Sequence, residues 1–130
     1  MIVVDASALL EALLQTPVGV AVEARLLGAS EMLHAPYLLD AEIAQVIRRF
    51  ALAGDLDEER GRAALEDFMA FPIHRHPHEF LLPRVWMLRN NFSAYDAMYV
   101  ALAEVLDAPL LTHDRRLAVA ARRYTQVELV

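Results

Sequence analysis

The sequence predicts an α/β fold, in which helices cover both faces of a parallel β-sheet. Short apolar segments, typical of buried strands, alternate with longer amphipathic segments, typical of helices, over the whole chain. Hydrophobic residues make up 57% of the chain, which is enough to bury a core. The 130 residues contain no repeat, low-complexity tract or linker, so we expect a single domain over residues 1–130.

The first half of the chain predicts two strands and three helices. Short apolar runs indicate the strands, and apolar residues at helical spacing indicate the helices. The strands are expected at Ile2–Val4 and Met32–Ala35, and the helices at Ala6–Gln15, Val18–Leu27 and Tyr37–Ala53. Pro17 breaks the first helix, and Gly28 and Gly54 end the other two, because glycine readily adopts the conformation that follows a helix.

The second half predicts four helices and three strands. Three of the helices have a capping residue whose side-chain oxygen can accept a hydrogen bond from a free backbone N–H. They begin at Asp57, Ser93 and Asp114 and run to Ala70, Leu106 and Arg123. The fourth is expected at Glu79–Arg89, with Pro83 in its first turn. The strands are expected at Pro72–Arg75, Pro109–Thr112 and Val127–Val130.

Composition excludes several classes of protein. The chain has no cysteine, which removes disulfides and thiolate chemistry and suits a cytoplasmic protein. No apolar run approaches the ~20 residues that cross a bilayer, and Met1–Asp5 has no basic segment typical of a signal peptide. A net charge of -6 argues against broad electrostatic binding of nucleic acid, although a cluster of carboxylates in a site would make the whole chain more acidic than its binding surface. All basic residues are arginine, for which the codon preference of a GC-rich genome is the favoured explanation.

Two acids follow strands. Asp5 comes directly after the first strand, and Asp114 lies two residues after Leu110–Thr112. In open parallel sheets, binding sites form outside the carboxyl ends of the strands, where the strand order reverses. If these two strands are neighbours at that point, Asp5 and Asp114 face the same crevice.

Two further acids lie on helices, beside the apolar face. Glu42 is three residues from Leu39 and four from Val46, both on the apolar stripe of its helix. Asp96 is three residues from Tyr99 and four from Val100, on the apolar side of the later helix. Acids turned toward the protein interior are rarely buried unless they are paired or bound to a cation.

Each acid by itself has an ordinary explanation. Asp5 and Asp114 suit helix caps, Ser93 and Asp96 form a capping-box variant, and Glu42 suits a half-exposed helix edge. As a set, the four carboxylates offer hard oxygen ligands to Mg²⁺ or Mn²⁺. A bound divalent ion polarises a phosphoryl oxygen and activates water, so the site needs no serine, cysteine or histidine nucleophile.

Four motifs resemble the PIN-domain family, and in particular the VapC toxins of bacterial toxin–antitoxin pairs. The motifs are Val3–Ser7, Pro36–Glu42, Ser93–Glu104 and Leu110–Leu117. They cover essentially the whole chain, in the family's order. The resemblance implies a PIN-like, doubly wound α/β/α sandwich with a five-stranded parallel sheet. It also implies cleavage of RNA phosphodiesters by metal-activated water.

The resemblance assigns roles to particular residues. Asp5, Glu42, Asp96 and Asp114 match the family's acidic positions, whereas Arg116 stands where some relatives have another acid and leaves the number of metal ions open. The flanking hydroxyls that would orient the acids or a metal-bound water are Ser7, Ser93 and Thr112. The resemblance further implies a homodimer that is inhibited by a VapB-type antitoxin.

Other features suggest weaker hypotheses. The alternating His74, His76 and His78 could hold zinc, but solvent-facing loop histidines are the favoured interpretation. Trp86, with Met87 and Leu88, suits a core or dimer-interface anchor better than a platform for base stacking. Arg115, beside an acid of the site, is the best candidate for a contact with RNA.

Three other functions are possible for a fold of this class, and the residues argue against each. A non-catalytic, magnesium-binding regulatory domain of the receiver type needs adjacent acids after the first strand and a lysine near the last, and both are missing. A haloacid-dehalogenase-type phosphatase needs Asp-x-Asp after the first strand, where this chain has Asp5-Ala6-Ser7. The presence of all four acids argues against an interaction protein with a degenerate site.

Overall fold

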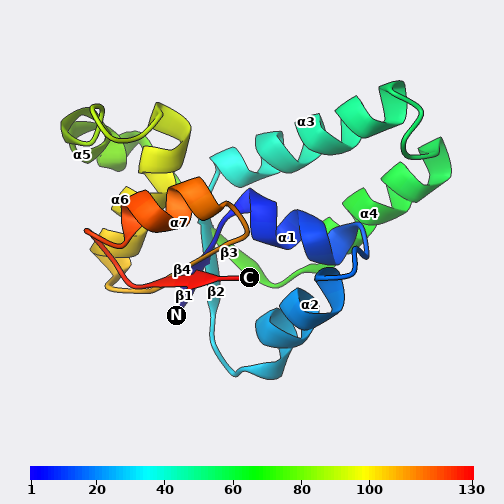
Figure 1. Cartoon of the computed structure of the whole chain (residues 1–130), viewed down its shortest axis with the longest axis horizontal. Coiled ribbons are helices and arrows are strands. Elements are labelled where there is room, and N and C mark those ends of the chain that lie inside the picture. Colours follow the sequence, from blue (N-terminus) through cyan, green and yellow to red (C-terminus); the bar gives the residue numbers. More distant parts are fainter.

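The computed structural model describes all residues from Met1 to Val130. Its centre is a five-stranded sheet with the order β3-β2-β1-β4-β5 (Figure 1). The strands are β1 (Ile2–Val4), β2 (Leu33–Pro36), β3 (Ile73–His76), β4 (Leu110–Thr112) and β5 (Val127–Leu129). All neighbouring strands are parallel. The chain winds from β1 toward one edge and later from β4 toward the other, so the predicted doubly wound sheet is confirmed.

Helices lie on both sides of this sheet (Figure 1). On one side are α1 (Ala6–Leu13), α2 (Gly19–Gly28), α3 (Leu38–Leu52) and α4 (Glu58–Ala70). On the other are the 3-10 turn η1 (Glu79–Leu81) and the helices α5 (Leu82–Met87), α6 (Ala94–Leu106) and α7 (Arg115–Ala121). The predicted three-layer sandwich is thereby confirmed. No helix combines the length and the apolar character that crossing a bilayer requires.

The core lies between the sheet and the two helical layers. Ile2, Val3 and Val4 are completely buried, which explains why β1 is apolar at every position and not at alternate ones. On α6, every residue of Tyr99–Ala103 is buried, so this helix is apolar around most of its circumference. The packing holds β1, β4 and α6 in fixed positions, and these elements carry or precede three of the four predicted site acids.

Some predicted helix boundaries differ from the structure. The segment Glu79–Arg89 is not one helix but the turn η1 followed by α5. In a helix starting at Glu79, Pro83 would leave the Glu79 carbonyl without its N–H partner, whereas at the start of α5 no N–H is required. The helix α1 ends at Leu13, two residues early, and Gln15 adopts a positive φ of 53°.

The interpretation of Trp86 and Met87 as core residues is wrong. Both side chains are 67% exposed, whereas Leu88 is buried. The helix α5 has only six residues, so it presents a narrow face to the core, and Val85 and Leu88 occupy that face. The guanidinium of Arg89 covers the Trp86 ring at 4.3 Å from its centroid.

The strand expected at Pro72–Arg75 is confirmed as β3, and the interpretation of His74 and His76 as loop residues is therefore wrong. Beside them, on β2, His34 is only 5% exposed, and its Nδ1 lies 2.8 Å from Nε2 of His76. Pairing with β2 forms the strand and stacks the three rings on one face of the sheet. No group of three His, Cys, Asp or Glu side chains in the chain is arranged to hold a metal by itself, so the zinc hypothesis gains no support.

Candidate active site

Asp5 lies at the carboxyl end of β1 and is 6% exposed. Its Oδ2 accepts hydrogen bonds from the hydroxyl of Ser7 at 2.5 Å and from that of Thr112 at 2.8 Å. Although Asp5 occupies the N-cap position of α1, its side chain makes no capping bond. Burial raises the pKa of Asp5 above 3.8, and the hydrogen bonds from the two hydroxyls lower it in part. The carboxylate is therefore held in a specific orientation by two hydroxyls, one from the first turn of α1 and one from β4.

The two hydroxyls that hold Asp5 join β1 to β4. Ser7 Oγ and Thr112 Oγ1 are 3.1 Å apart. The backbone N–H of His113 donates to Ser7 Oγ, and that of Asp114 donates to Thr112 Oγ1. The loop that carries Asp114 is thus anchored to the Asp5 site through these contacts. Both hydroxyls have the orienting position that the sequence predicted for them.

Glu42 comes from the first turns of α3 and has a partner that the sequence analysis missed. The hydroxyl of Tyr99, a completely buried residue of α6, donates to Glu42 Oε1 at 2.7 Å. Tyr99 lies on the apolar face of its predicted helix, and a buried tyrosine hydroxyl usually has a hydrogen-bond partner. The position of Tyr99 could therefore have indicated such a contact. The contact joins the two helical layers at the end of the sheet and orients Glu42.

Asp96 and Asp114 both lie at helix N-termini. Ser93 Oγ accepts from the N–H of Asp96 at 3.1 Å and caps α6, as predicted. Asp114 Oδ1 accepts from the N–H groups of Arg116 and Leu117 and caps α7. The capping interpretation of Asp114 is therefore confirmed. One of its carboxylate oxygens takes both capping bonds, and the other has no partner in the protein.

The four acids form one electrostatic cluster. Burial first, and then the charges of Asp5 and Asp96, raise the pKa of Glu42. Burial first, and then the charges of Asp5 and Asp114, raise the pKa of Asp96. The structure therefore brings all four predicted acids together near the carboxyl ends of β1 and β4, where the strand order reverses.

The donor set fits Mg²⁺ or Mn²⁺. It consists of carboxylate oxygens, which are the hard ligands that these ions prefer. The hydroxyls of Ser7 and Thr112 donate hydrogen bonds to one of these carboxylates. The carboxylates do not converge to direct ligand distances around one point. This spacing is compatible with Mg²⁺, which usually binds few carboxylates and keeps several waters. A cation would also offset the repulsion that raises the pKa values of Glu42 and Asp96.

The raised pKa values predict how the metal-free protein responds to pH. Between the ordinary value, 4.5 for Glu42, and its raised value, the folded state binds more protons than the unfolded state. The free energy of unfolding therefore falls as pH rises through that window. In EDTA at about pH 7, Glu42→Gln should melt a few degrees above wild type, because the neutral amide is not penalised by burial and still accepts from Tyr99.

Thermal melts over a pH series that begins near the ordinary value of 4.5 and continues upward to neutral pH measure this effect. The wild-type melting temperature should fall over this range, and the fall should be smaller for Glu42→Gln. Glu23→Gln is the matched control, because Glu23 is exposed and has no ion pair. A Glu42→Gln variant that melts below wild type would show that Glu42 is not under electrostatic strain.

Two hollows adjoin the acid cluster. A polar hollow of about 370 Å³ is bordered by Asp96, Asp114 and Arg116. An apolar one of about 310 Å³ lies between α3 and α6, where Glu42, Val46 and Tyr95 border it. Arg115, the predicted RNA contact, is exposed and borders neither hollow.

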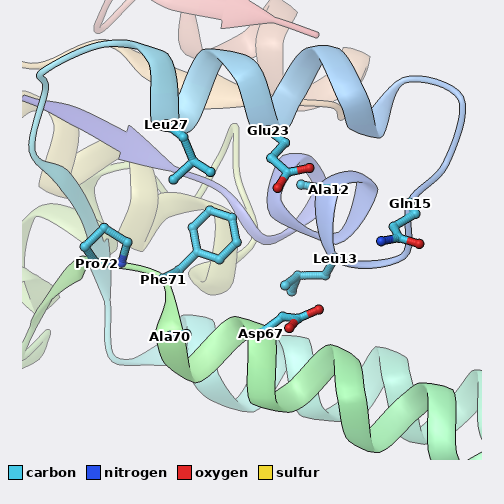
Figure 2. A pocket seen from close by; sticks show the side chains of 9 residues that line it. All are labelled: Ala12, Leu13, Gln15, Glu23, Leu27, Asp67, Ala70, Phe71 and Pro72. Atoms are coloured by element: carbon cyan, nitrogen blue, oxygen red, sulfur yellow. The ribbon is translucent and has the colours of Figure 1, made fainter.

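A further hollow, of about 300 Å³, lies apart from these acids, between α1, α2 and α4 (Figure 2). Figure 2 shows the Phe71 ring in its middle, with Leu27 and Glu23 extending from α2 and Asp67 from α4. None of the four site acids borders it. Its position gives it no part in chemistry at the carboxyl end of β1.

Comparisons with known proteins agree with this architecture. A family model described as PIN domain matches residues 2–123. The VapC ribonuclease Mb0985 of Mycobacterium bovis is 45% identical over 130 residues, which are 100% of this chain and 98% of that protein. Ribonuclease VapC1 of Mycobacterium tuberculosis is 43% identical over 98% of this chain and 96% of that protein. The structure of VapBC2 from Rickettsia felis, bound to a promoter DNA fragment, aligns with this chain at a TM-score of 0.72 and 14% identity. The alignment covers 99% of this chain and 98% of the other, and it supports the fold.

Proposed function

The chain belongs to the PIN-domain family, and we propose that it is a metal-dependent endoribonuclease that acts as the toxin of a VapBC-type pair. The observation that carries the proposal is the cluster of four carboxylates from separate elements at one end of the sheet. The relatives at 45% and 43% identity are named ribonucleases and are matched over nearly their whole length, which supports RNA as the substrate. We further propose that residues 1–130 act as one PIN domain.

The residues proposed to hold the ion are Asp5, Glu42, Asp96 and Asp114. Mg²⁺ is the favoured ion and Mn²⁺ the second candidate, and the bound ion would polarise a phosphoryl oxygen and supply an activated water. Around it, Ser7 and Thr112 fix the Asp5 carboxylate, and Tyr99 fixes Glu42. Ser93 orients Asp96 by capping α6. These contacts reduce the motion of the proposed ligands, which would keep a bound ion and the scissile phosphate aligned.

The proposed partners follow from the same family. We propose that a VapB-type antitoxin binds and inhibits the enzyme, and the naming of a VapBC2 assembly in the structure from Rickettsia felis supports such a partner. We also propose that the chain forms a homodimer and acts in the cytoplasm, where its RNA substrates are found. Light scattering of the purified chain would test the dimer directly.

Sequencing of RNA ends after induced expression tests the proposed activity. Expression in a bacterial host should produce new 5′ ends at a small number of RNA positions and arrest growth. The Asp5→Asn chain, expressed at the same level, should produce neither effect. New RNA ends that appear equally with wild type and Asp5→Asn would come from host nucleases, and the proposed function would then be wrong. The mapped ends would also identify the RNA target.

A further inference from the structure

The guanidinium of Arg116 has no ion-pair or hydrogen-bond partner in the protein, a property that it shares with Arg48, Arg49, Arg115, Arg122 and Arg123. Its guanidinium makes no ion pair within 4.0 Å and donates no side-chain hydrogen bond. By contrast, several arginines form ion pairs with carboxylates, and these are Arg25, Arg62, Arg75 and Arg84. The five N–H donors of Arg116 are therefore available to a ligand.

The surroundings of Arg116 indicate which ligand it would bind. It borders the polar hollow of about 370 Å³, together with the site acids Asp96 and Asp114. The remaining polar lining is supplied by Arg89, Asn90, Asn91 and Ser93. Arg89 is held in place, because its Nη1 donates to the Trp86 carbonyl and its guanidinium stacks on the Trp86 ring. The hollow thus combines two guanidinium groups with two side-chain amides at the edge of the acid cluster.

The charge of Arg116 acts on the acid cluster without neutralising it. Burial and the neighbouring acids raise the pKa of Asp96, and the positive charge of Arg116 lowers it in part. Arg116 is thus close enough to Asp96 to affect its charge, yet too far to form an ion pair with it. A cation bound by Asp96 would be repelled by the same guanidinium.

We propose that the hollow bordered by Arg116 binds a phosphate of the RNA substrate next to the scissile phosphate, with Arg116 as the main contact. This inference rests on the proposed function, and it adds the path that the RNA backbone takes across the protein surface. A guanidinium binds two phosphate oxygens in a planar fork, and the amides of Asn90 and Asn91 can bind the attached ribose or base. In a chain with a net charge of -6, such a local positive site gives RNA a preferred path toward the acids.

The proposal predicts effects of opposite sign on RNA and on metal. Arg116→Gln should weaken RNA binding about tenfold, because one charge-assisted contact is lost. It should also reduce the slope of log K against log salt by about 0.7, the value for one phosphate contact on single-stranded nucleic acid. The same variant should bind Mn²⁺ several-fold more tightly, because a positive charge beside Asp96 is removed.

A fluorescent single-stranded RNA that contains the mapped cleavage site is the probe for RNA binding. Its affinity is measured in Mg²⁺ over a salt series, with every variant in an Asp5→Asn background that prevents cleavage. Mn²⁺ binding is measured separately by calorimetry in the otherwise wild-type chain. Arg123→Gln is the matched control, because Arg123 is also exposed and unpaired but borders a hollow at the opposite ends of β4 and β5. Arg116→Lys should bind RNA more tightly than Arg116→Gln but less tightly than wild type, because lysine keeps the positive charge and loses the two-pronged guanidinium contact.

Three results would overturn the inference. The first is an Arg116→Gln variant that binds RNA with unchanged affinity and unchanged salt slope, even if Mn²⁺ binds more tightly, since Arg116 would then be only a counter-ion of Asp96. The second is an equal loss in Arg123→Gln, which would reflect net charge alone. The third is a wild-type chain that does not cleave RNA in Mg²⁺, which would overturn the proposed function and this inference together. Cleavage by wild type with normal RNA binding by Arg116→Gln would overturn this inference alone.

Discussion

Asp5→Asn is expected to reduce RNA cleavage by at least ~10²-fold while the protein remains folded. Loss of a residue that only orients a metal ligand costs about 10–100-fold in metal affinity or activity, and loss of a ligand itself should cost more. Asp5 is the most buried of the four acids and interacts electrostatically with both Glu42 and Asp96. Its carboxylate is therefore the central negative charge of the cluster.

The fold should tolerate this substitution, because asparagine has nearly the same shape as aspartate. The hydroxyls of Ser7 and Thr112 can rotate to accept from the new amide or to donate to its oxygen. The change also removes a buried charge, whose burial is unfavourable in the metal-free protein. The melting temperature in EDTA should therefore be equal to that of wild type or higher.

Asp107→Asn is the matched control for Asp5→Asn. Asp107 is exposed, ends α6 far along the chain from Ser93, and has a positive φ of 48°, which asparagine also adopts. The control loses the same charge and should cleave RNA at the wild-type rate. Gel assays on purified proteins would measure both variants. Full cleavage by a folded Asp5→Asn variant would show that Asp5 is not part of the active site.

The sequence could predict the positions of the site acids that directly follow strands. Asp5 and Asp114 follow apolar runs, and parallel strands align their carboxyl ends, so the two acids could be placed together without a structure. The spacing of apolar residues along the two helices likewise predicted that Glu42 and Asp96 face the protein interior. The contact between Tyr99 and Glu42 could not be predicted, because it depends on how α3 and α6 pack across the sheet.

The same limit applies to the histidines and arginines. The strand that carries His74 could be predicted locally, but the position of His74 and His76 beside the buried His34 depends on pairing with β2, which the local sequence does not show. Arg115 and Arg116 are adjacent in the sequence, and only the tertiary structure, which brings the start of α7 to the same hollow as Asp96, determines that Arg116 borders it. Contacts between distant elements decide these cases, whereas local patterns decide strands, caps and helix faces.

Removal of divalent metal is expected to abolish cleavage completely and to lower the stability of the wild-type protein. The proposed nucleophile is a water that the bound ion activates, and the chain has no cysteine that could take its place. Excess EDTA should therefore reduce cleavage to background, and added Mg²⁺ or Mn²⁺ should restore it. EDTA saturated beforehand with Mg²⁺ is the control for effects of the chelator itself.

The stability measurement separates metal binding from catalysis. A ligand that binds only the folded state at about 100 times its dissociation constant stabilises that state by about 2.7 kcal/mol. For a chain of 130 residues, this corresponds to a rise in melting temperature of about 10 °C. The rise should shrink strongly in Asp5→Asn and persist in Asp107→Asn, because only the first variant loses a carboxylate of the cluster. Cleavage that continues in excess EDTA, or an equal metal-induced rise in Asp5→Asn, would contradict a metal site built on these four acids.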